Sequence, residues 1–310
     1  MDLAFLDATA QAALVQRGEL GPGDLVAAAA ARVLRLNPSL NAVTRSLFEG
    51  DPEVRVQRTA APFCGVPALV DPPFRAGEGP FAPGLGLVVA GIANLTDPAV
   101  SDAREAARNP WDISRTPGTG SGGAAAAVAA GLVPVAYGRA VLAPSASCGV
   151  LGFQGTGEPA GLIARSVRDG GARRSATTAG AVRGLRIRLV LQPEGLHPDC
   201  LDAVNDAATL CAAIGHQVTA PAEDPSGCDL WLAPGLHEPP PPLELSPWSR
   251  PPSTVAAGPA LAVPLFWNPR GLPVGVLFSG PPGAEALLLR LAAQLESARP
   301  WAHRRPPVHA

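Results

Sequence analysis

Glycine, serine and threonine are concentrated in one short stretch, Gly118-Thr-Gly-Ser-Gly-Gly123, directly before an alanine-rich run that ends at Gly131. A glycine-rich loop at the start of a helix exposes backbone N–H groups that can hold a phosphate, and a serine there can supply a nucleophilic hydroxyl. A dinucleotide site is therefore the first interpretation to consider.

The residues around the loop disfavour the dinucleotide interpretation. A dinucleotide fingerprint follows a buried strand directly, but residues 109–117 contain Pro110 and Pro117, which a central strand does not tolerate. The acidic residue expected about twenty residues later is also missing, because the chain reads Tyr137-Gly-Arg-Ala140 there. We therefore expect no nucleotide or other cofactor.

Lysine is absent from the chain, since all 24 residues counted as Lys or Arg are arginine. A serine hydroxyl is a weak nucleophile until a neighbouring base accepts its proton, and a neutral amine is one such base. Arginine cannot take that role because guanidinium keeps its proton at any usable pH. Mechanisms that depend on a lysine base, a Schiff base or a phosphate-binding lysine are therefore excluded.

The five histidines and five cysteines show no spacing typical of a metal site or a redox dithiol. We expect the histidines to be exposed or capping residues, and the cysteines to be reduced thiols of a cytoplasmic protein. Cys148 is expected to be buried and inert. No metal ion is expected.

Composition argues against two classes of partner. Of the 310 residues, 47% are hydrophobic and only 16% are charged, and the net charge is -2, so no basic surface is expected to attract nucleic acid. The longest apolar run, residues 124–138, is mostly alanine and is interrupted by Gly131 and Pro134. It is shorter than the roughly 20 apolar residues that span a bilayer. We expect neither a nucleic-acid partner nor a membrane association.

Hydrophobic periodicity and turn residues predict alternating helices and strands. A helix capped by Asp7 ends near Arg17, and a second helix begins at Pro22 and is expected to stop at Asn37-Pro38. Prolines between residues 220 and 252 predict an irregular connection. The fold class is α/β, a mixed β-sheet flanked by helices. Further helices are predicted over 124–131, 198–214 and 285–298, and strands over 65–70, 86–93, 185–191, 255–264 and 275–278.

Several segments resemble the amidase signature family, in the same order along the chain. Arg108-Asn-Pro-Trp-Asp112, the glycine loop and its alanine-rich run resemble the Gly-Gly-Ser-Ser-Gly-Gly loop and helix of that family. Because the resemblance covers nearly the whole chain, it implies an amidase-signature fold. The other matching segments are 20–43, Gly65-Val-Pro-Ala-Leu-Val70, 161–169, 228–234, 259–264, 271–275 and 288–301.

The resemblance implies one amidase-like domain over residues 1–310. Family members have a long, mainly helical stretch before the segment that resembles 228–234, so we expect a truncated middle region and a shallow or open cleft. The expected parts are N-terminal helices over 1–62, a signature core over 63–170, a shortened variable region with the proline-rich connection over 171–250, and C-terminal core strands and a helix over 251–310.

Members of this family hydrolyse amides with a serine nucleophile, a second serine on a cis peptide that relays the proton, and a lysine base. The resemblance places these three roles at Ala140, Gly120 and Asp71 of this chain. Residues 138–143 are also a shorter stretch than the family's, and lack the glycines whose N–H groups would bind an oxyanion. The remaining hydroxyls that could substitute are Ser121, the second serine of the family's pair, and Ser145.

Two of these residues have a structural interpretation. Ser121 is expected to cap the alanine-rich helix with its side chain. Asp71 is expected to be a solvated or arginine-paired loop acid before Pro72-Pro73.

The leading functional hypothesis is a catalytically inactive amidase homologue, a pseudoenzyme that acts through binding or as a subunit. We expect a small amide-like ligand, and a homodimer or a complex with another subunit because truncation would expose apolar surface. The alternative is an active hydrolase of non-peptide amide bonds with a rearranged site that uses Ser121 or Ser145. A third alternative, a gene product without a selected role, predicts the same sequence features as the first.

Overall fold

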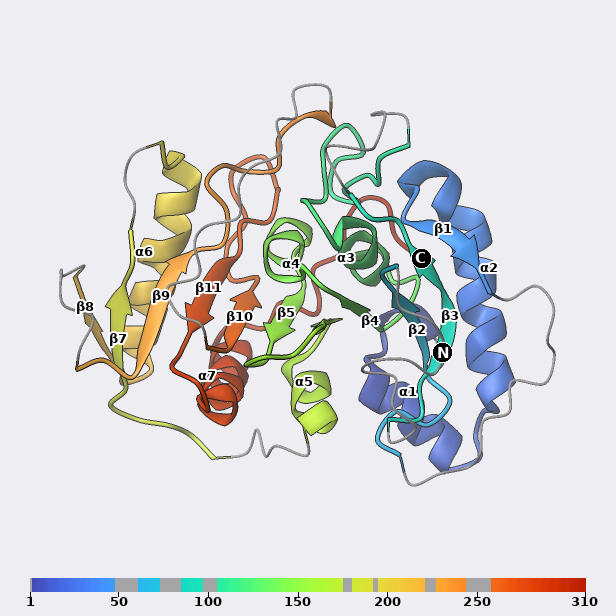
Figure 1. Cartoon of the computed structure of the whole chain (residues 1–310), viewed down its shortest axis with the longest axis horizontal. Coiled ribbons are helices and arrows are strands. Elements are labelled where there is room, and N and C mark those ends of the chain that lie inside the picture. The colour runs from blue at the N-terminus through green and yellow to red at the C-terminus, as the bar shows by residue number, and fades with distance from the viewer. Residues whose placement is uncertain are drawn as a thin grey trace.

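The computed structural model describes residues 2–47, 61–72, 85–96, 105–174, 180–191, 195–220, 227–243 and 258–310. Strands from these ranges form one sheet in the spatial order β1-β3-β2-β4-β6-β5-β10-β11-β9-β7-β8 (Figure 1). The strands are β1 (Val43–Ser46), β2 (Pro67–Val70), β3 (Val88–Ala93), β4 (Val135–Gly138), β5 (Leu151–Gln154), β6 (Gly161–Ala164), β7 (Arg186–Leu189), β8 (Gln217–Thr219), β9 (Leu230–Pro234), β10 (Ala260–Val263) and β11 (Val276–Ser279). The helices are a 3-10 helix at Leu3–Phe5, α1 (Ala8–Gln16), α2 (Pro22–Leu40), α3 (Gly122–Ala129), α4 (Leu142–Cys148), α5 (Val167–Arg174), α6 (Pro198–Ala213) and α7 (Glu285–Ala298).

The sheet is mixed, as predicted. β2 runs parallel to β3 and β4, and β7 runs parallel to β8 and β9. The pairs from β4 through β6, β5, β10 and β11 to β9 are antiparallel. The predicted fold class, a mixed sheet flanked by helices, is therefore confirmed.

Helices cover both faces of the sheet. Leu69, Ala136 and Ile163 pack in a cluster with α2 and α3, whereas the adjacent residues Val70 and Tyr137 pack in a cluster with α1. Because side chains alternate along a strand, the two sets lie on opposite faces. Burial on both faces explains why the strands read as continuous apolar runs in the sequence.

Every residue of α3 is buried. Its first two residues approach the neighbouring chain so closely that only glycine fits, since a Cβ on Gly122 would lie 2.3 Å from Thr96 Oγ1 and one on Gly123 would lie 2.5 Å from the Asn94 carbonyl O. The glycines at the helix start therefore have a packing role. The helix ends before Gly131, whose φ is 78°, as the sequence predicts.

α2 is longer than predicted, because Pro38 lies inside the helix. The helix ends at Leu40 and is capped by Asn41, which has a left-handed φ of 45° and donates its N–H to the Asn37 carbonyl O at 2.7 Å. Proline has no N–H to give to the carbonyl of Leu34, but Leu34 is 74% exposed and water can satisfy that carbonyl. The predicted stop at Asn37-Pro38 is therefore wrong.

The predicted irregular connection between residues 220 and 252 contains β9, which lies within the matching segment 228–234. Residues 221–226 and 244–252 of this connection lie outside the described residues, as does Val255, the predicted beginning of the next strand. None of the helices in the described part of the chain is long and apolar enough to cross a membrane.

Candidate functional site

Asp71, the residue directly after β2, is fully buried. Its N–H donates to the Tyr137 carbonyl O at 3.0 Å, and its Oδ2 accepts a hydrogen bond from Ser121 Oγ at 2.5 Å. The expectation of a solvated or arginine-paired loop acid is therefore wrong. A serine hydroxyl from a distant part of the sequence binds this carboxyl inside the protein.

Ser121 occupies the N-cap position of α3, but its side chain makes no capping hydrogen bond. Its Oγ donates to Asp71 and accepts from the Ala140 N–H at 3.3 Å. The prediction that this hydroxyl caps the helix is therefore wrong, because the hydroxyl is directed at the carboxyl and away from the first helical turn. Hydrogen bonds to an ionised group are stronger than neutral ones, which favours this orientation.

Gly120 and Ala140 lie against each other beside this pair. A Cβ on Gly120 would lie 2.5 Å from the Cβ of Ala140, and Gly120 has a left-handed φ of 79°. Gly120 is fixed by a two-way bridge to Thr96, whose N–H donates to the Gly120 carbonyl at 3.0 Å and whose carbonyl accepts the Gly120 N–H at 2.9 Å. The structure thus brings together Asp71, Gly120, Ser121 and Ala140.

Gly138, the last residue of β4, closes the site from the sheet side. A Cβ there would lie 2.1 Å from Ser121 Oγ and 2.2 Å from Asp71 Oδ2. Neither the sequence patterns nor the family resemblance assigns Gly138 to the site. A glycine at the end of an otherwise apolar strand is a signal for a close approach by another group.

Burial raises the pKa of the Asp71 carboxyl to about 6, since desolvation disfavours the charged form. The hydrogen bond from Ser121, the Arg139 backbone N–H and the Arg139 charge act in the opposite direction. Oδ1 of Asp71 is buried and has no hydrogen-bond partner among the described residues. At neutral pH the group is mostly an incompletely solvated carboxylate, which is a weaker base than a neutral lysine amine.

Ser145 does not join this group through any hydrogen bond that the described residues show. It lies in α4, is fully buried, and its Oγ has no hydrogen-bond partner in the described part of the chain. A Cβ on Gly152 would lie 2.6 Å from that Oγ, so the hydroxyl is enclosed between α4 and β5. A serine without a neighbouring base is not activated as a nucleophile.

Three backbone amides near Ser121 are already bound to protein acceptors. The N–H of Gly120 donates to Thr96 O, that of Ser121 to Ala140 O, and that of Ala140 to Ser121 Oγ. An oxyanion site needs donors directed at the position of the developing negative charge. These three amides do not provide one in this arrangement.

Two other titratable residues, His197 and Cys148, have structural roles. His197 caps α6, since its Nδ1 accepts from the Asp199 N–H at 3.1 Å. Cys148 is buried, and burial raises the pKa of its thiol, so it is not a thiolate nucleophile at neutral pH. Over the described ranges, no group of three or more His, Cys, Asp or Glu side chains is arranged to hold a metal ion.

Comparison with known proteins shows that this chain is similar to amidases. The family model described as Amidase matches residues 95–160. "Putative amidase AmiB2" of Mycobacterium tuberculosis (strain ATCC 25618 / H37Rv) is 28% identical over 457 residues, which cover 99% of each chain. Because this chain has 310 residues, that relative contains long stretches without a counterpart here.

A second relative gives a higher identity over a shorter span. 6-aminohexanoate-cyclic-dimer hydrolase of Pseudomonas sp. (strain NK87) is 31% identical over 288 residues, or 68% of this chain and 58% of that protein. The solved structure of a 6-aminohexanoate cyclic dimer hydrolase complexed with its substrate superposes with a TM-score of 0.83 at 25% identity, over 100% of each chain. The chain belongs to the amidase signature family, and is similar to amide hydrolases throughout its length.

Proposed function

We propose that this chain is a pseudoenzyme of the amidase signature family, which binds a small amide-like ligand or acts as a subunit and does not hydrolyse amides. The observation that carries the proposal is the hydrogen bond of 2.5 Å between Ser121 Oγ and Asp71 Oδ2, both in side chains that are fully buried. A nucleophile must reach the carbonyl carbon of its substrate, and a hydroxyl enclosed by protein atoms cannot.

The neighbouring residues support the same conclusion. By resemblance, Gly120 and Ala140 stand where the family has its relay serine and its nucleophile, and neither has a side-chain hydroxyl. Asp71 stands where the family has lysine, and its pKa of about 6 makes it a weak acceptor for a serine proton. Removing the members of a catalytic unit lowers turnover by up to roughly a million-fold in another serine hydrolase.

An active hydrolase that uses Ser121 is the second candidate. The hydrogen bond from Ser121 to Asp71 favours it, because a hydroxyl paired with a carboxylate is the arrangement of a nucleophile and a base. In that case the rate would rise with pH as Asp71 loses its proton near pH 6. The burial of both side chains argues against this candidate.

Labelling with a fluorophosphonate tests the proposal at the level of single residues. We expect intact-mass analysis to show unmodified protein after a time in which an active serine hydrolase is fully labelled, because the candidate hydroxyls of Ser121 and Ser145 are both buried. The control variants Ser121→Ala and Ser145→Ala should give the same result. A mass increase that disappears only in Ser121→Ala would establish the second candidate instead.

Assembly and location are further parts of the proposal. A homodimer or a complex with another subunit stays a prediction, and sedimentation of the purified chain would test it. The large apolar side chains that are exposed in the described part of the chain are Leu34, Leu47, Ile113 and Leu201. The cytoplasmic location and the lack of a nucleic-acid partner also stay predictions.

A further inference from the structure

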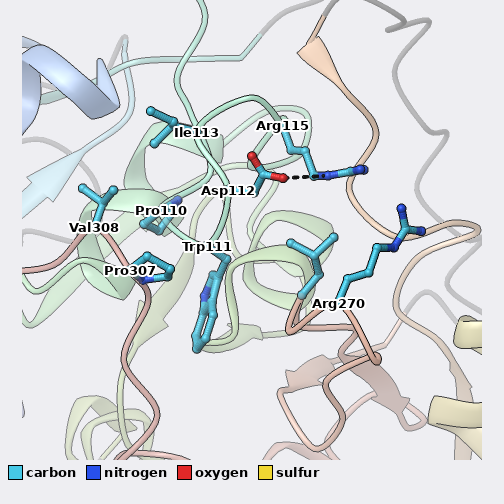
Figure 2. A pocket seen from close by; sticks show the side chains of 9 residues that line it. Pro110, Trp111, Asp112, Ile113, Arg115, Arg270, Pro307 and Val308 are labelled. Carbon is cyan, nitrogen blue, oxygen red and sulfur yellow. Dashed lines mark hydrogen bonds and ion pairs between the residues drawn. The ribbon is translucent and has the colours of Figure 1, made fainter.

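A pocket of about 310 Å³ lies between the loop that begins at Pro110, the turn at Arg270–Leu272 and the C-terminal residues Pro307 and Val308 (Figure 2). None of its lining residues belongs to the Asp71–Ser121 pair or to Gly120, Gly138 and Ala140. Its volume is at the lower end of the range that small-molecule sites occupy.

Arg115 is held in a fixed position on one side of this pocket. Its Nε donates to Asp112 Oδ2 at 3.0 Å, and one terminal nitrogen donates to the Pro240 carbonyl O at 2.6 Å. The other terminal nitrogen has no such bond among the described residues. A guanidinium that is already oriented loses little side-chain entropy when it binds an anion.

Arg270 supplies a second positive charge. Within the described ranges its guanidinium has no ion pair and no hydrogen bond, and in Figure 2 it extends on the same side of the pocket as the Arg115 side chain. The backbone at Arg270 is fixed by Asn268, whose Oδ1 accepts the N–H groups of Arg270 at 3.1 Å and of Leu272 at 3.0 Å. Among the described residues that line the pocket, Asp112 is the one carboxylate beside two arginines, so these three groups together carry a net positive charge.

The other walls of the pocket are apolar. Trp111 and Val308 lie across from the charged side (Figure 2). The indole of Trp111 is fixed because its Nε1 donates to the Cys148 carbonyl O at 2.8 Å, and its ring packs on Trp267 with centroids 5.8 Å apart. The Val308 N–H donates to the Pro110 carbonyl O at 3.2 Å. The pocket therefore combines rigid apolar walls with two cationic groups on one side.

We infer that this pocket binds a small organic carboxylate with a compact apolar body. The carboxylate lies between the guanidinium groups of Arg115 and Arg270, where planar N–H donors match its two oxygens. The apolar body lies against Trp111 and Val308, where its burial contributes to affinity. A neutral amide of the same shape lacks the charge that these arginines recognise. The pocket is thus a ligand site separate from the Asp71–Ser121 pair.

Titration of protein labelled with ¹⁵N at the tryptophan indoles tests this inference. The probe is 3-phenylpropionate, and its neutral counterpart is 3-phenylpropanamide. We expect the Trp111 indole signal, assigned with Trp111→Phe, to shift and saturate with a dissociation constant of about 1 mM or tighter. The amide should bind at least about tenfold more weakly, and added salt should weaken the binding of the carboxylate.

Arg270→Gln is the decisive variant, because this exposed guanidinium has no partner in the described part of the chain whose loss would disturb the fold. We expect it to weaken 3-phenylpropionate binding about tenfold or more without changing the melting temperature. Arg45→Gln, which removes an exposed arginine on β1, should leave the affinity unchanged. The inference is wrong if the Trp111 signal does not saturate, if the amide binds as tightly as the carboxylate, or if Arg270→Gln binds as tightly as the unaltered protein.

Discussion

Gly138→Ala is expected to destabilise the protein by about 3 kcal/mol, since the added methyl group would occupy the space of the hydrogen bond between Ser121 and Asp71. The Cβ would lie 2.1 Å from Ser121 Oγ and 2.2 Å from Asp71 Oδ2. The backbone cannot move away easily, because β4 is paired with β2 on one side and with β6 on the other. Urea denaturation at neutral pH measures the effect.

A matched glycine provides the control for this prediction. Gly23 lies in α2, and a Cβ there meets nothing within 4 Å, so Gly23→Ala should stabilise the protein slightly through its better helix propensity. Combining Gly138→Ala with Ser121→Ala removes one of the two close contacts and should recover part of the loss. If Gly138→Ala is as stable as the unaltered protein, the serine and the carboxyl are not packed against β4 as described.

Asp71→Asn is expected to stabilise the protein by about 2 kcal/mol at pH 8. Burial raises the pKa of Asp71 from 3.8 to about 6, and each pKa unit corresponds to about 1.4 kcal/mol between the two protonation states. Asparagine removes the buried charge and still accepts the Ser121 hydrogen bond. The amide nitrogen of the asparagine would take the position of Asp71 Oδ1, where it finds no acceptor among the described residues. This unsatisfied donor offsets about 1 kcal/mol of the gain in stability.

The contribution of Asp71 to the stability of the protein depends on pH. The folded state binds the Asp71 proton more tightly than the unfolded state, so the contribution of this group to stability is present below about pH 4 and is lost as the pH rises to about 6. The advantage of Asp71→Asn should therefore appear across that interval and remain constant above it. Denaturation curves of both proteins from pH 4 to 8 measure the difference between their free energies of unfolding. The other carboxyl groups are the same in both proteins, so their contributions cancel in this difference.

Asp229→Asn is the contrasting variant. The Arg186 side chain lowers the pKa of Asp229 through a hydrogen bond, and this ion pair is largely exposed. Its removal should lower stability at pH 8 by less than about 1 kcal/mol, a change of opposite sign. An Asp71→Asn protein that is less stable than the unaltered chain at pH 8 would show that the Asp71 carboxylate is stabilising, contrary to its described environment.

The sequence was sufficient to predict the mixed α/β fold and the helices α1, α2, α3, α6 and α7, because helix caps, glycine stops and apolar runs are local signals. The central strands β4, β5 and β6 were not predicted. α7 matches the predicted helix over 285–298, and α6 differs from its prediction by a single residue. The end of α2 was predicted too early because Pro38 indicates a helix stop. A proline near a helix end destabilises the helix little when the carbonyl that it leaves without a hydrogen bond is exposed to water. The division into one domain with four parts stays a prediction.

The candidate site was harder to predict, because its defining contact joins residues that are 50 positions apart. The resemblance identified Asp71, Gly120 and Ala140, and the structure places them around Ser121. Nothing local indicates that Asp71 is buried, since the aspartate precedes prolines in a stretch that reads as a turn. The position of Gly138 is likewise set by what packs against it, which sequence periodicity does not reveal.

Amide turnover is the measurement that tests the central claim most directly. Purified protein would be incubated with 6-aminohexanoate cyclic dimer and a panel of alkyl and aryl amides, and the release of amine or ammonia followed by mass spectrometry. We expect rates equal to the buffer background from pH 5 to 9, and no difference between the unaltered protein, Ser121→Ala and Ser145→Ala. Turnover above background that increases through pH 6 and disappears in folded Ser121→Ala would contradict the assignment of this chain as a pseudoenzyme.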